Sequence, residues 1–413
     1  MTRVVVVGGG GREHALAWGL SAAADVVVTP GNDGIAAHGI TCTSVPATEL
    51  DADLVVVGPE APLVAGLADE LRARGVAVLG PGAAGARLEG SKAYLKEFLA
   101  AAGVATAAHG TFDDVDAALA YLATMTPPYV IKTDGLAAGK GVLVTTSHAE
   151  AAADVAAKLS GAAFGAAGRR VVIEEGLVGT ECSLMLLCDG ERAAALVPAQ
   201  DFKRVGDGDQ GANTGGMGAF APRALDAATR ARVDAEIVAP TLVELRRRHI
   251  DYRGVLYAGL MLTDQGPKLL EYNVRFGDPE TQVLVPLVRD DLLATLAATA
   301  AGHVDAVPAR DRGAAVTVVL ASPGYPEAPQ VGGPVSGLGP DGQLADPLEG
   351  VVVFHAGTRH DGSGGFVAAG GRVLSVTAHA PTLAEARARA YEAAGRIDLP
   401  GMVWRHDIAA GAA

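Results

Sequence analysis

The sequence lacks any apolar run long enough to cross a membrane. Hydrophobic residues make up 49% of the 413 residues, but most of them are alanines and short valine runs. No uninterrupted stretch approaches the roughly 18 residues that a spanning helix needs. The chain leads directly into a strand-like run, Arg3–Val7, with no charged and then apolar leader before it. We therefore expect a cytoplasmic protein with no membrane partner.

Cysteine and excess positive charge are also scarce. The three cysteines, Cys42, Cys182 and Cys188, are an odd number without the paired spacing of a zinc site. We expect them to be reduced thiols with structural roles. The formal net charge of -14 argues against a nucleic acid partner, because such partners select a basic protein surface. Anions would have to bind at local sites that the backbone helps to build.

Lysine is rare among the basic residues. Only 7 of the 33 lysines and arginines are lysines. A bias toward arginine leaves lysine as a candidate wherever a compact ammonium on a flexible stem is needed. Four of the seven fall within the motifs described below, namely Lys92, Lys132, Lys140 and Lys203.

Short apolar strands alternate with helical segments over the first 90 residues. Continuous runs such as Arg3–Val7 and Leu54–Val57 are typical of a parallel sheet that is covered on both faces. A helix is predicted over Thr111–Thr124. From Tyr129 the pattern changes to paired strands around a helix, which predicts a small α+β module. The pattern of the last hundred residues predicts strands and loops, followed by a helix at Leu383–Ile397.

Four consecutive glycines, Gly8–Gly11, follow the first strand and open a helix. Such a loop offers unshielded N–H groups and a helix N-terminus to a phosphate. A dinucleotide is a poor fit, because Glu13 or His14 replaces the third glycine of that fingerprint in either register. The second strand also ends at Thr29-Pro30, where a ribose-binding acid is expected. A single phosphate on a smaller ligand fits better, and a plain strand-to-helix turn is the alternative.

A second glycine-rich loop, Gly135–Gly141, lies between two predicted strands. It is not a Walker A loop, because only three residues separate Gly135 from Gly139 and a glycine follows Lys140. A glycine-rich hairpin between strands can fold over nucleotide phosphates and exclude water from a reactive intermediate. Lys132, at the end of the preceding strand, can reach the phosphates. The loop is therefore predicted to be a nucleotide-covering flap.

The strand that follows Leu269 carries the predicted metal site. Glu271, Asn273 and Arg275 share one face, since side chains alternate along a strand. Mg²⁺ prefers hard oxygen ligands and takes the rest from water and nucleotide phosphate. Glu271 and Asn273 therefore predict a Mg²⁺ or Mn²⁺ site. Arg275 suits a clamp for a carboxylate or for the charge on a transferring phosphoryl group.

The order of these features resembles the ATP-grasp superfamily. Two lysines precede a glycine-rich flap, a strand then runs through Glu174 into a hinge, and Glu-x-Asn comes last. The resemblance implies that ATP is the nucleotide and that Glu174 belongs to its site. It also implies that the backbone at Glu175 and Leu177 binds the adenine and that Glu181 binds the ribose. The residues implied to hold or cover the phosphates are Lys92, Lys132, Gly135, Ala138, Gly139, Lys140 and Gly141.

Longer motifs narrow the resemblance to the phosphoribosylamine–glycine ligases. They run in order along the chain as Gly-Gly-Arg-Glu-His-Ala-Leu (10–16), Val-Gly-Pro-Glu-Ala-Pro-Leu (57–63), Leu-Glu-Gly-Ser-Lys-Ala (88–93), Lys-Thr-Asp-Gly-Leu-Ala-Ala-Gly-Lys-Gly (132–141), Gln-Asp-Phe-Lys-Arg-Val-Gly-Asp (200–207), Asn-Thr-Gly-Gly-Met-Gly (213–218) and Arg-Phe-Gly-Asp-Pro-Glu-Thr-Gln (275–282). Ala212 stands where that family usually has proline, and Thr133 where alanine is common. Neither departure removes a reactive group.

The resemblance implies an ATP-dependent ligase that joins glycine to 5-phosphoribosylamine through a glycyl phosphate, in purine synthesis. Catalysis would rest on Arg275, Lys140 and Asp201, with Asp201 accepting hydrogen bonds from an ammonium. Gly9–Gly11 would bind the 5-phosphate and Glu60 a ribose hydroxyl. The full set of implied substrate-binding residues is Gly9, Gly10, Gly11, Glu60, Asp201, Asn213, Thr214, Gly215, Gly216 and Arg275.

Three domains are expected, in an α/β and α+β fold. They are an N-terminal Rossmann-like domain with a parallel sheet (1–90), an ATP-grasp domain (91–303) with a small mobile lid (about 113–180), and a β-rich C-terminal domain (304–413). We expect a monomer. Two other interpretations stay open, namely another ATP-grasp enzyme, such as an aminoimidazole ribonucleotide carboxylase or a D-alanine ligase, and a nucleotide-binding regulatory module without turnover.

Overall fold

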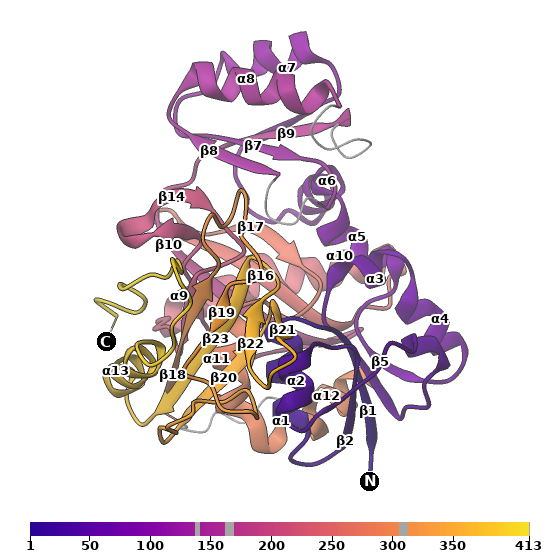
Figure 1. The fold of residues 1–413 in the computed structure, drawn as a ribbon. Helices are drawn as coiled ribbons and strands as arrows, with labels where there is room; N and C mark the ends of the chain where they lie inside the picture. Colours follow the sequence, from indigo (N-terminus) through magenta and orange to yellow (C-terminus); the bar gives the residue numbers. More distant parts are fainter. Residues whose placement is uncertain (137–140, 162–168, 305–312, 413) are drawn as a thin grey trace.

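A computed structural model describes residues 1–136, 141–161, 169–304 and 313–412. Figure 1 shows a large body that contains both chain termini, and a smaller layered module that projects from it. Among the described residues, no helix is both long and apolar enough to span a membrane.

The N-terminal sheet is parallel and is buried on both faces, as predicted. Its five strands lie in the order β3-β2-β1-β4-β5. They are β1 (Arg3–Gly8), β2 (Asp25–Pro30), β3 (Thr41–Cys42), β4 (Leu54–Val57) and β5 (Ala77–Leu79). The helices of this region are α1 (Gly11–Leu20), α2 (Asp33–Ala37), α3 (Glu60–Val64), α4 (Leu67–Ala73) and α5 (Ala83–Gly90). Val4, Val5 and Val6 of the central strand have no exposed surface, which explains the continuous apolar run.

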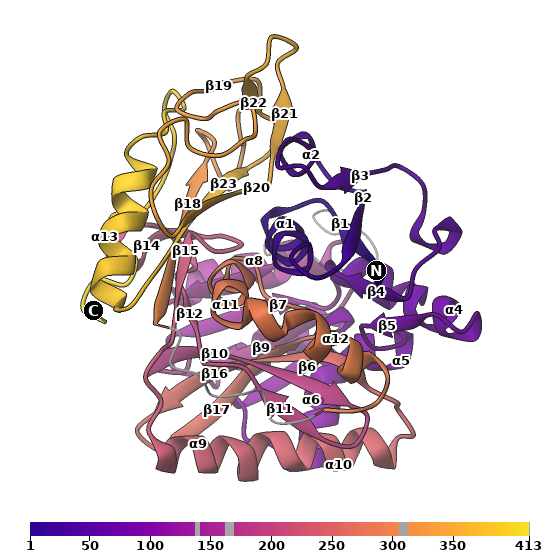
Figure 2. The same ribbon diagram turned by 90° about the horizontal axis from the view of Figure 1, so that it is seen from below.

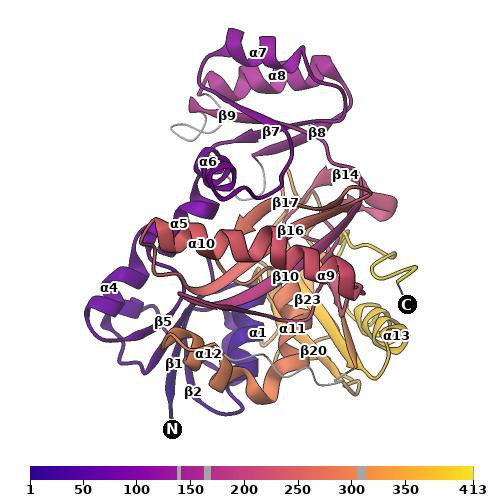
Figure 3. The same ribbon diagram turned by 180° about the vertical axis from the view of Figure 1, so that it is seen from behind.

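The central sheet is antiparallel, with strand order β11-β10-β16-β17. Its strands are β10 (Thr180–Asp189), β11 (Ala193–Ala195), β16 (Arg253–Thr263) and β17 (Gly266–Asn273). Figure 3 shows one face covered by a long helix, which consists of α9 (Ala227–Val233), a π-helical turn (Asp234–Val238) and α10 (Ala239–Arg247). The π turn ends two residues before Pro240, which has no N–H for a regular helical ladder.

Two further helices cover the other face of the central sheet at one end only. They are α11 (Glu280–Val288) and α12 (Leu292–Ala300), separated by a 3₁₀ turn at Arg289–Asp291. Figure 2 shows them between this sheet and α1 of the N-terminal region. Their apolar residues share one core with α1. The remaining part of this face carries the polar groups described below.

The projecting module, called the lid here, is a four-stranded sheet with two helices on one face (Figure 1). It contains β6 (His109–Phe112), β7 (Tyr129–Thr133), β8 (Val142–Thr145), β9 (Val171–Glu175), α7 (Val115–Leu122) and α8 (His148–Leu159). The helix predicted over Thr111–Thr124 is wrong at its start. Residues 109–112 pair with β9, and α7 begins only behind Asp114, whose carboxylate accepts the N–H of Ala117.

The C-terminal region shares a sheet with residues 200–221. The order is β12-β15-β18-β23-β20, and α13 (Leu383–Ala394) packs on this sheet. The strands are β12 (Gln200–Asp201), β15 (Gly218–Ala221), β18 (Ala314–Ala321), β20 (Val351–His355) and β23 (Arg372–Ala380). A smaller sheet contains β19 (Pro334–Val335), β21 (Thr358–His360) and β22 (Phe366–Ala368), and a hairpin contains β13 (Arg204–Gly206) and β14 (Gln210–Asn213).

Gly254 provides a test of the contact between the N-terminal and central sheets. It has φ +151, and a Cβ placed there would lie 2.8 Å from Cα of Gly80. Gly75 also has a positive φ, +82, but a Cβ there would meet nothing within 4 Å. Both alanine substitutions place a Cβ on a backbone with positive φ, and this conformation costs free energy for any residue other than glycine. Because of the clash, Gly254→Ala should lower the free energy of unfolding by about 1–3 kcal/mol more than Gly75→Ala, measured by urea denaturation. Equal losses would mean that the sheets can separate at this point without cost.

Candidate active site

One face of the central sheet changes from apolar to polar along its length. Near α11 and α12, Met185, Leu187 and Val255 are buried in the core that contains those helices. Side chains on one face of a strand lie two residues apart, so Ser183 and Glu181 continue the same face of β10. The polar half of this face lies at the end of the strands where β10 begins.

A shift in register within β17 keeps two polar side chains on this face. The pairing of β16 with β17 is irregular at Leu270, which is an extra residue without a partner of its own. Leu269 and Tyr272 are therefore both buried in the core beneath α9, although they are three residues apart. Glu271 and Asn273 lie on the opposite, partly exposed face, as the period of two predicts.

Glu271 lies within a cluster of cations. Burial raises the pKa of Glu271, but the cations outweigh burial and lower this pKa to about 2. They are Lys92, Lys132, Lys203 and Arg275. Lys92 is the first residue of α6 (Lys92–Ala102). Glu271 is therefore ionised at neutral pH, and its surroundings are positive overall, which favours an anionic ligand.

Arg275 lies just beyond the end of β17 and is held by two carboxylates. Its guanidinium contacts Glu89 at 2.8 Å and Glu60 at 3.3 Å, and it donates to Oδ1 of Asn273 at 3.3 Å. Burial favours the neutral form of Arg275, but the carboxylates prevail and raise its pKa above the ordinary value. Arg275 is thus a fixed cation beside Asn273. Since Glu60 binds Arg275, the ribose contact predicted for Glu60 stays a prediction.

The predicted nucleotide hinge lies at the base of the lid. Glu174 is buried, and its side chain pairs with Lys132 at 3.0 Å. The backbone N–H of Glu175 donates to Ala108 O at 2.9 Å, so this N–H is not available to a nucleotide base. Leu177 follows directly, after Gly176. These positions agree with a backbone-built base site, and the contacts themselves stay predictions.

Part of the predicted flap lies outside the described residues, namely Ala137, Ala138, Gly139 and Lys140. At its base, the carbonyl of Gly141 accepts the N–H of Thr133 at 2.9 Å, which closes the β7–β8 hairpin. Gly135 has φ +117, which only glycine adopts readily. Asp134 accepts hydrogen bonds from the Ser91 hydroxyl and the Ala93 N–H at the start of α6. The flap therefore begins and ends beside the helix that carries Lys92.

Asp201 is buried beside Lys203 and Glu181, whose side chains are 35% and 37% exposed. Lys203 donates to Glu181 at 2.7 Å and lies 3.8 Å from Asp201. Burial raises the pKa of Asp201, Lys203 opposes this, and Glu280 adds to it, so that the pKa reaches about 7. Within the described residues, Oδ1 of Asp201 has no hydrogen-bond partner. A bound cation would supply what this oxygen lacks.

The predicted substrate loop, Asn213–Gly216, is fixed by the C-terminal region. Arg372 binds the carbonyl of Gly215 and, at 3.0 Å, the carboxylate of Asp278. The Gly215 N–H donates to the Tyr325 hydroxyl at 3.1 Å. Thr214 donates both its N–H and its hydroxyl to the Lys203 carbonyl, at 2.8 and 2.9 Å. The loop thus lies beside Lys203, but most of its polar groups already have partners within the chain.

The N-terminal glycine loop is occupied in part by its own helix. Glu13 accepts the Gly10 N–H at 2.7 Å and pairs with Arg12. Side chains at Gly8 or Gly58 would collide with Glu13, which gives a packing reason for glycine at these positions. A Cβ on Gly10 would lie 3.8 Å from the Asp278 carboxylate, so the loop is close to the segment that follows β17. Phosphate binding by Gly9–Gly11 stays a prediction.

Some residues of this region were missed by sequence reasoning. Arg372 and Tyr325 gave no local signal, and Glu89 was given no role although it stands in the quoted motif 88–93, because these roles arise from contacts between distant segments. Glu280 stands in a quoted motif, and here its carboxylate accepts hydrogen bonds from Ser183 and Tyr257. Ser183 is thus part of a hydrogen-bonded group rather than an activated nucleophile.

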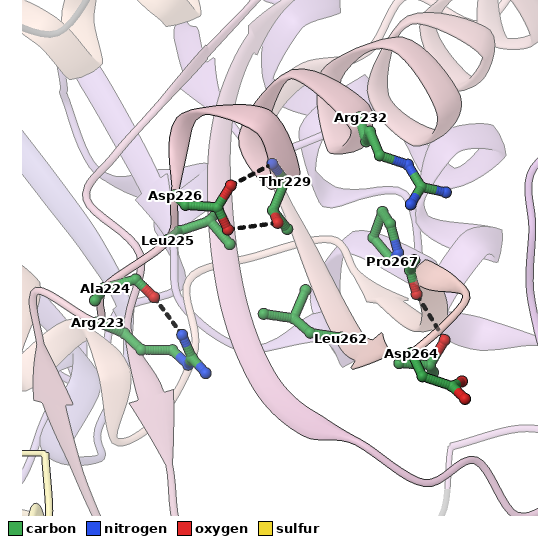
Figure 4. Close-up of a pocket in the computed structure, with 11 residues that line it drawn as sticks. Arg223, Ala224, Leu225, Asp226, Thr229, Arg232, Leu262, Asp264 and Pro267 are labelled. Atoms are coloured by element: carbon green, nitrogen blue, oxygen red, sulfur yellow. Dashed lines mark hydrogen bonds between the residues drawn. The ribbon is translucent and has the colours of Figure 1, made fainter.

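A surface hollow lies elsewhere on the central sheet (Figure 4). Its volume is about 340 Å³, and residues from the start of α9 and from the β16–β17 turn line it. Asp226 caps the start of α9 there, because its carboxylate accepts hydrogen bonds from the N–H and the hydroxyl of Thr229. None of the predicted site residues lines this hollow, so we assign no catalytic role to it.

Comparisons with known proteins agree on one family. Three family models match in order, namely the N domain of phosphoribosylglycinamide synthetase (residues 2–89), its ATP-grasp (A) domain (90–281) and its C domain (315–411). A phosphoribosylamine–glycine ligase of Mesorhizobium japonicum is 48% identical over 419 residues, which are 98% of this chain and 97% of that protein. One of Streptomyces coelicolor is 48% identical over 430 residues, covering 100% of this chain and 99% of that protein.

Solved structures show the same relationship. Phosphoribosylamine–glycine ligase from Thermotoga maritima superposes with a TM-score of 0.86 and is 36% identical, covering 98% of this chain and 100% of that one. A biotin carboxylase domain from Hydrogenobacter thermophilus, in complex with MgADP, ADP and bicarbonate, has a TM-score of 0.72 over 98% of this chain and 91% of that one. At 17% identity it shares only the fold.

The fold and the matched central domain define an ATP-grasp protein. More narrowly, the chain belongs to the phosphoribosylglycinamide synthetase family. The resemblance drawn from the sequence motifs is thereby confirmed.

Proposed function

We propose that this chain joins glycine to 5-phosphoribosylamine with ATP, giving glycinamide ribonucleotide, ADP and phosphate in purine biosynthesis. The observation that carries the proposal is the polar face of the central sheet. There an ionised Glu271 surrounded by cations lies on the same side of the sheet as the group around Asp201. The first suits a metal and a polyphosphate, and the second suits an ammonium. A site for a metal and a polyphosphate next to a site for an ammonium suits ATP and an amino acid.

The donor set on β17 fits a magnesium or manganese ion. Glu271 is ionised at neutral pH, and Asn273 adds an amide oxygen on the same face. Within the described ranges, no group of three His, Cys, Asp or Glu residues is arranged to hold a metal. Two protein oxygens suit Mg²⁺, which commonly completes its shell with phosphate oxygens and water. Such an ion would neutralise charge on the transferring phosphoryl group.

In the first step, a carboxylate oxygen of glycine attacks the γ-phosphorus of ATP in line, and the bond from that phosphorus to the ADP oxygen breaks. The products are glycyl phosphate and ADP. Lys92 and Lys132 neutralise the ATP phosphates, and Lys140 is proposed to do so from the flap. Arg275, whose orientation is fixed by Glu89 and Glu60, stabilises charge near Asn273. Closure of the flap would exclude water from the acyl phosphate.

In the second step, the neutral amine of phosphoribosylamine attacks the carbonyl carbon of glycyl phosphate. The C–O bond to phosphate breaks, and the amine nitrogen loses one proton. The glycine ammonium stays protonated and is held by Asp201, whose buried Oδ1 accepts no hydrogen bond from the residues that the structure describes. Both steps depend on positioning and on charge stabilisation rather than on a protein nucleophile.

The proposal also assigns a role to each of the three expected domains. Residues 1–90 would bind the 5-phosphate at Gly9–Gly11, residues 91–303 would bind ATP and metal, and residues 304–413 would hold the substrate loop through Arg372. Arg372 already contacts Gly215 and Asp278. All proposed site residues lie in one chain, which supports a monomer as the working unit.

Release of ADP should require both glycine and freshly made phosphoribosylamine. Glu271→Ala should lower this activity on the order of 10²-fold, because it removes the charged metal ligand from a buried site. Glu236→Ala is the matched control, since Glu236 only pairs with Arg232 on the surface of the long helix. Coupled assays of ADP release would measure both variants. Glycine-independent ADP release by the wild type, or full activity of Glu271→Ala, would contradict the proposal.

Glycine affinity should depend on pH through Asp201. The pKa of Asp201 is raised to about 7, so its charged form, which pairs with an ammonium, is lost as pH falls below 7. The KM for glycine should rise up to about tenfold per pH unit below 7 and level off above 8. Asp201→Asn should raise the KM and abolish this dependence, whereas Asp207→Asn at the hairpin should keep it. An unchanged pH profile in Asp201→Asn would refute the assignment.

A further inference from the structure

A second lysine lies behind the nucleotide face and shares a carboxylate with Lys132. Lys96 on α6 and Lys132 on β7 contact different oxygens of Glu174, at 3.1 and 3.0 Å. The side chains of Lys96, Lys132 and Glu174 are only 2%, 9% and 2% exposed. One carboxylate neutralises one ammonium, so these three groups together keep one net positive charge away from bulk water, and this charge acts on the ionised Glu271. Such a charge is costly unless an anion binds it.

The same cluster is tied to the strand that carries the metal ligands. Lys96 donates to the Thr106 hydroxyl at 2.8 Å, and that hydroxyl donates to the carbonyl of Leu269 at 2.7 Å. The ammonium of Lys132 lies 3.5 Å from the carbonyl of Leu270. Lys132 therefore contacts the residue that precedes Glu271, and Lys96 is linked through Thr106 to the residue before that one. The lid, α6 and β17 meet at this cluster.

Burial makes the charged form of Lys96 depend on Glu174. Burial lowers the pKa of Lys96 to about 8, Glu174 opposes this, and Lys132 lowers it further. Burial thus destabilises the charged form of Lys96, and Glu174 stabilises it. Each lysine contacts one carboxylate oxygen of Glu174. While Lys96 is charged, Glu174 therefore cannot place both of its oxygens against Lys132.

We propose that Lys96 is a positioning residue for nucleotide binding, because it occupies one oxygen of Glu174 and so keeps that carboxylate from neutralising Lys132. Lys132 then retains a positive charge for the nucleotide phosphates. Lys96 lies behind Glu174 and does not touch the nucleotide. This inference rests on the proposed function, in which Lys132 binds phosphate, and it adds a residue to which the sequence motifs gave no role.

A purely structural role for Lys96 makes a different prediction once Glu174 is neutralised. If Lys96 only fills a buried space, loss of Glu174 as well should damage the site further. If Lys96 acts by competing for Glu174, replacing the Glu174 carboxylate with a neutral amide should restore the net positive charge around Lys132. The sign of the coupling between the two positions therefore separates the two roles.

The experiment measures the affinity for MgADP by titration calorimetry at pH 7, on the full chain. Lys96→Met should weaken binding about tenfold, which is within the range for charges in contact. The double variant Lys96→Met/Glu174→Gln should return to within about threefold of wild type, because Lys132 is then unopposed. A double variant that binds as weakly as Lys96→Met, or more weakly, would overturn the proposal.

Lys158→Met is the matched control. Lys158 is another lysine of the lid with a 3% exposed side chain, but it pairs with Asp154 on α8. This variant should bind MgADP within about twofold of wild type, and a tenfold loss there would overturn the proposal too. Thermal unfolding checks that each variant is folded. If Lys96→Met does not fold, Lys96→Gln replaces it, because glutamine keeps hydrogen-bond donors without the charge. A wild-type chain that binds no MgADP would contradict the proposed function itself.

Discussion

The attraction between the ionised carboxylate of Glu271 and the cations around it is the interaction on which the rest of the site depends. A chain of formal charge -14 would otherwise repel a triphosphate. Here cations from α6, from the lid, from the segment after β12 and from the end of β17 surround Glu271, where burial strengthens their effect on this carboxylate. The site is therefore both positive enough to attract ATP and equipped with an anionic oxygen to hold a divalent ion. Neither property follows from overall composition.

The arrangement of the three sheets serves to bring distant loops to this face. Arg275, at the end of β17, is held by Glu60 and Glu89 from the N-terminal region. Arg372, from the C-terminal region, holds the loop of Gly215 beside Asp278. The N-terminal, central and C-terminal regions are thus joined through arginine–carboxylate contacts, and Figure 2 shows their elements converging around α1 and α11. The lid approaches from the remaining side, as Figure 1 shows.

Sequence patterns predicted the features that local physics determines. The parallel N-terminal sheet followed from uninterrupted valine runs, and the shared face of Glu271 and Asn273 followed from strand periodicity. The irregularity at Leu270 was not predicted, because the glycine that stands beside it, Gly259, lies on the partner strand and not next to Leu270 in the sequence. It matters here, since without the extra residue Leu269 and Glu271 would lie on the same face.

Other features depend on contacts across the chain and left no trace in local patterns. Glu89 lies 186 residues from the arginine that it pairs with, Arg275. The glycine loop predicted for phosphate proved to hold Glu13 as well, because a capping carboxylate competes for the same N–H groups. The helix predicted from Thr111 began later, because pairing with β9 overrode helix propensity over residues 109–112. Motif resemblance supplied the family, which periodicity alone could not.

The central claim is that glycine is activated as an acyl phosphate on this face, and transfer of oxygen tests it most directly. Glycine labelled with ¹⁸O in its carboxylate would be converted with ATP and phosphoribosylamine, and the phosphate released would be analysed by mass spectrometry. If the carboxylate attacks the γ-phosphorus, each phosphate released carries one oxygen from glycine. Phosphate without label, formed together with glycinamide ribonucleotide, would contradict the account.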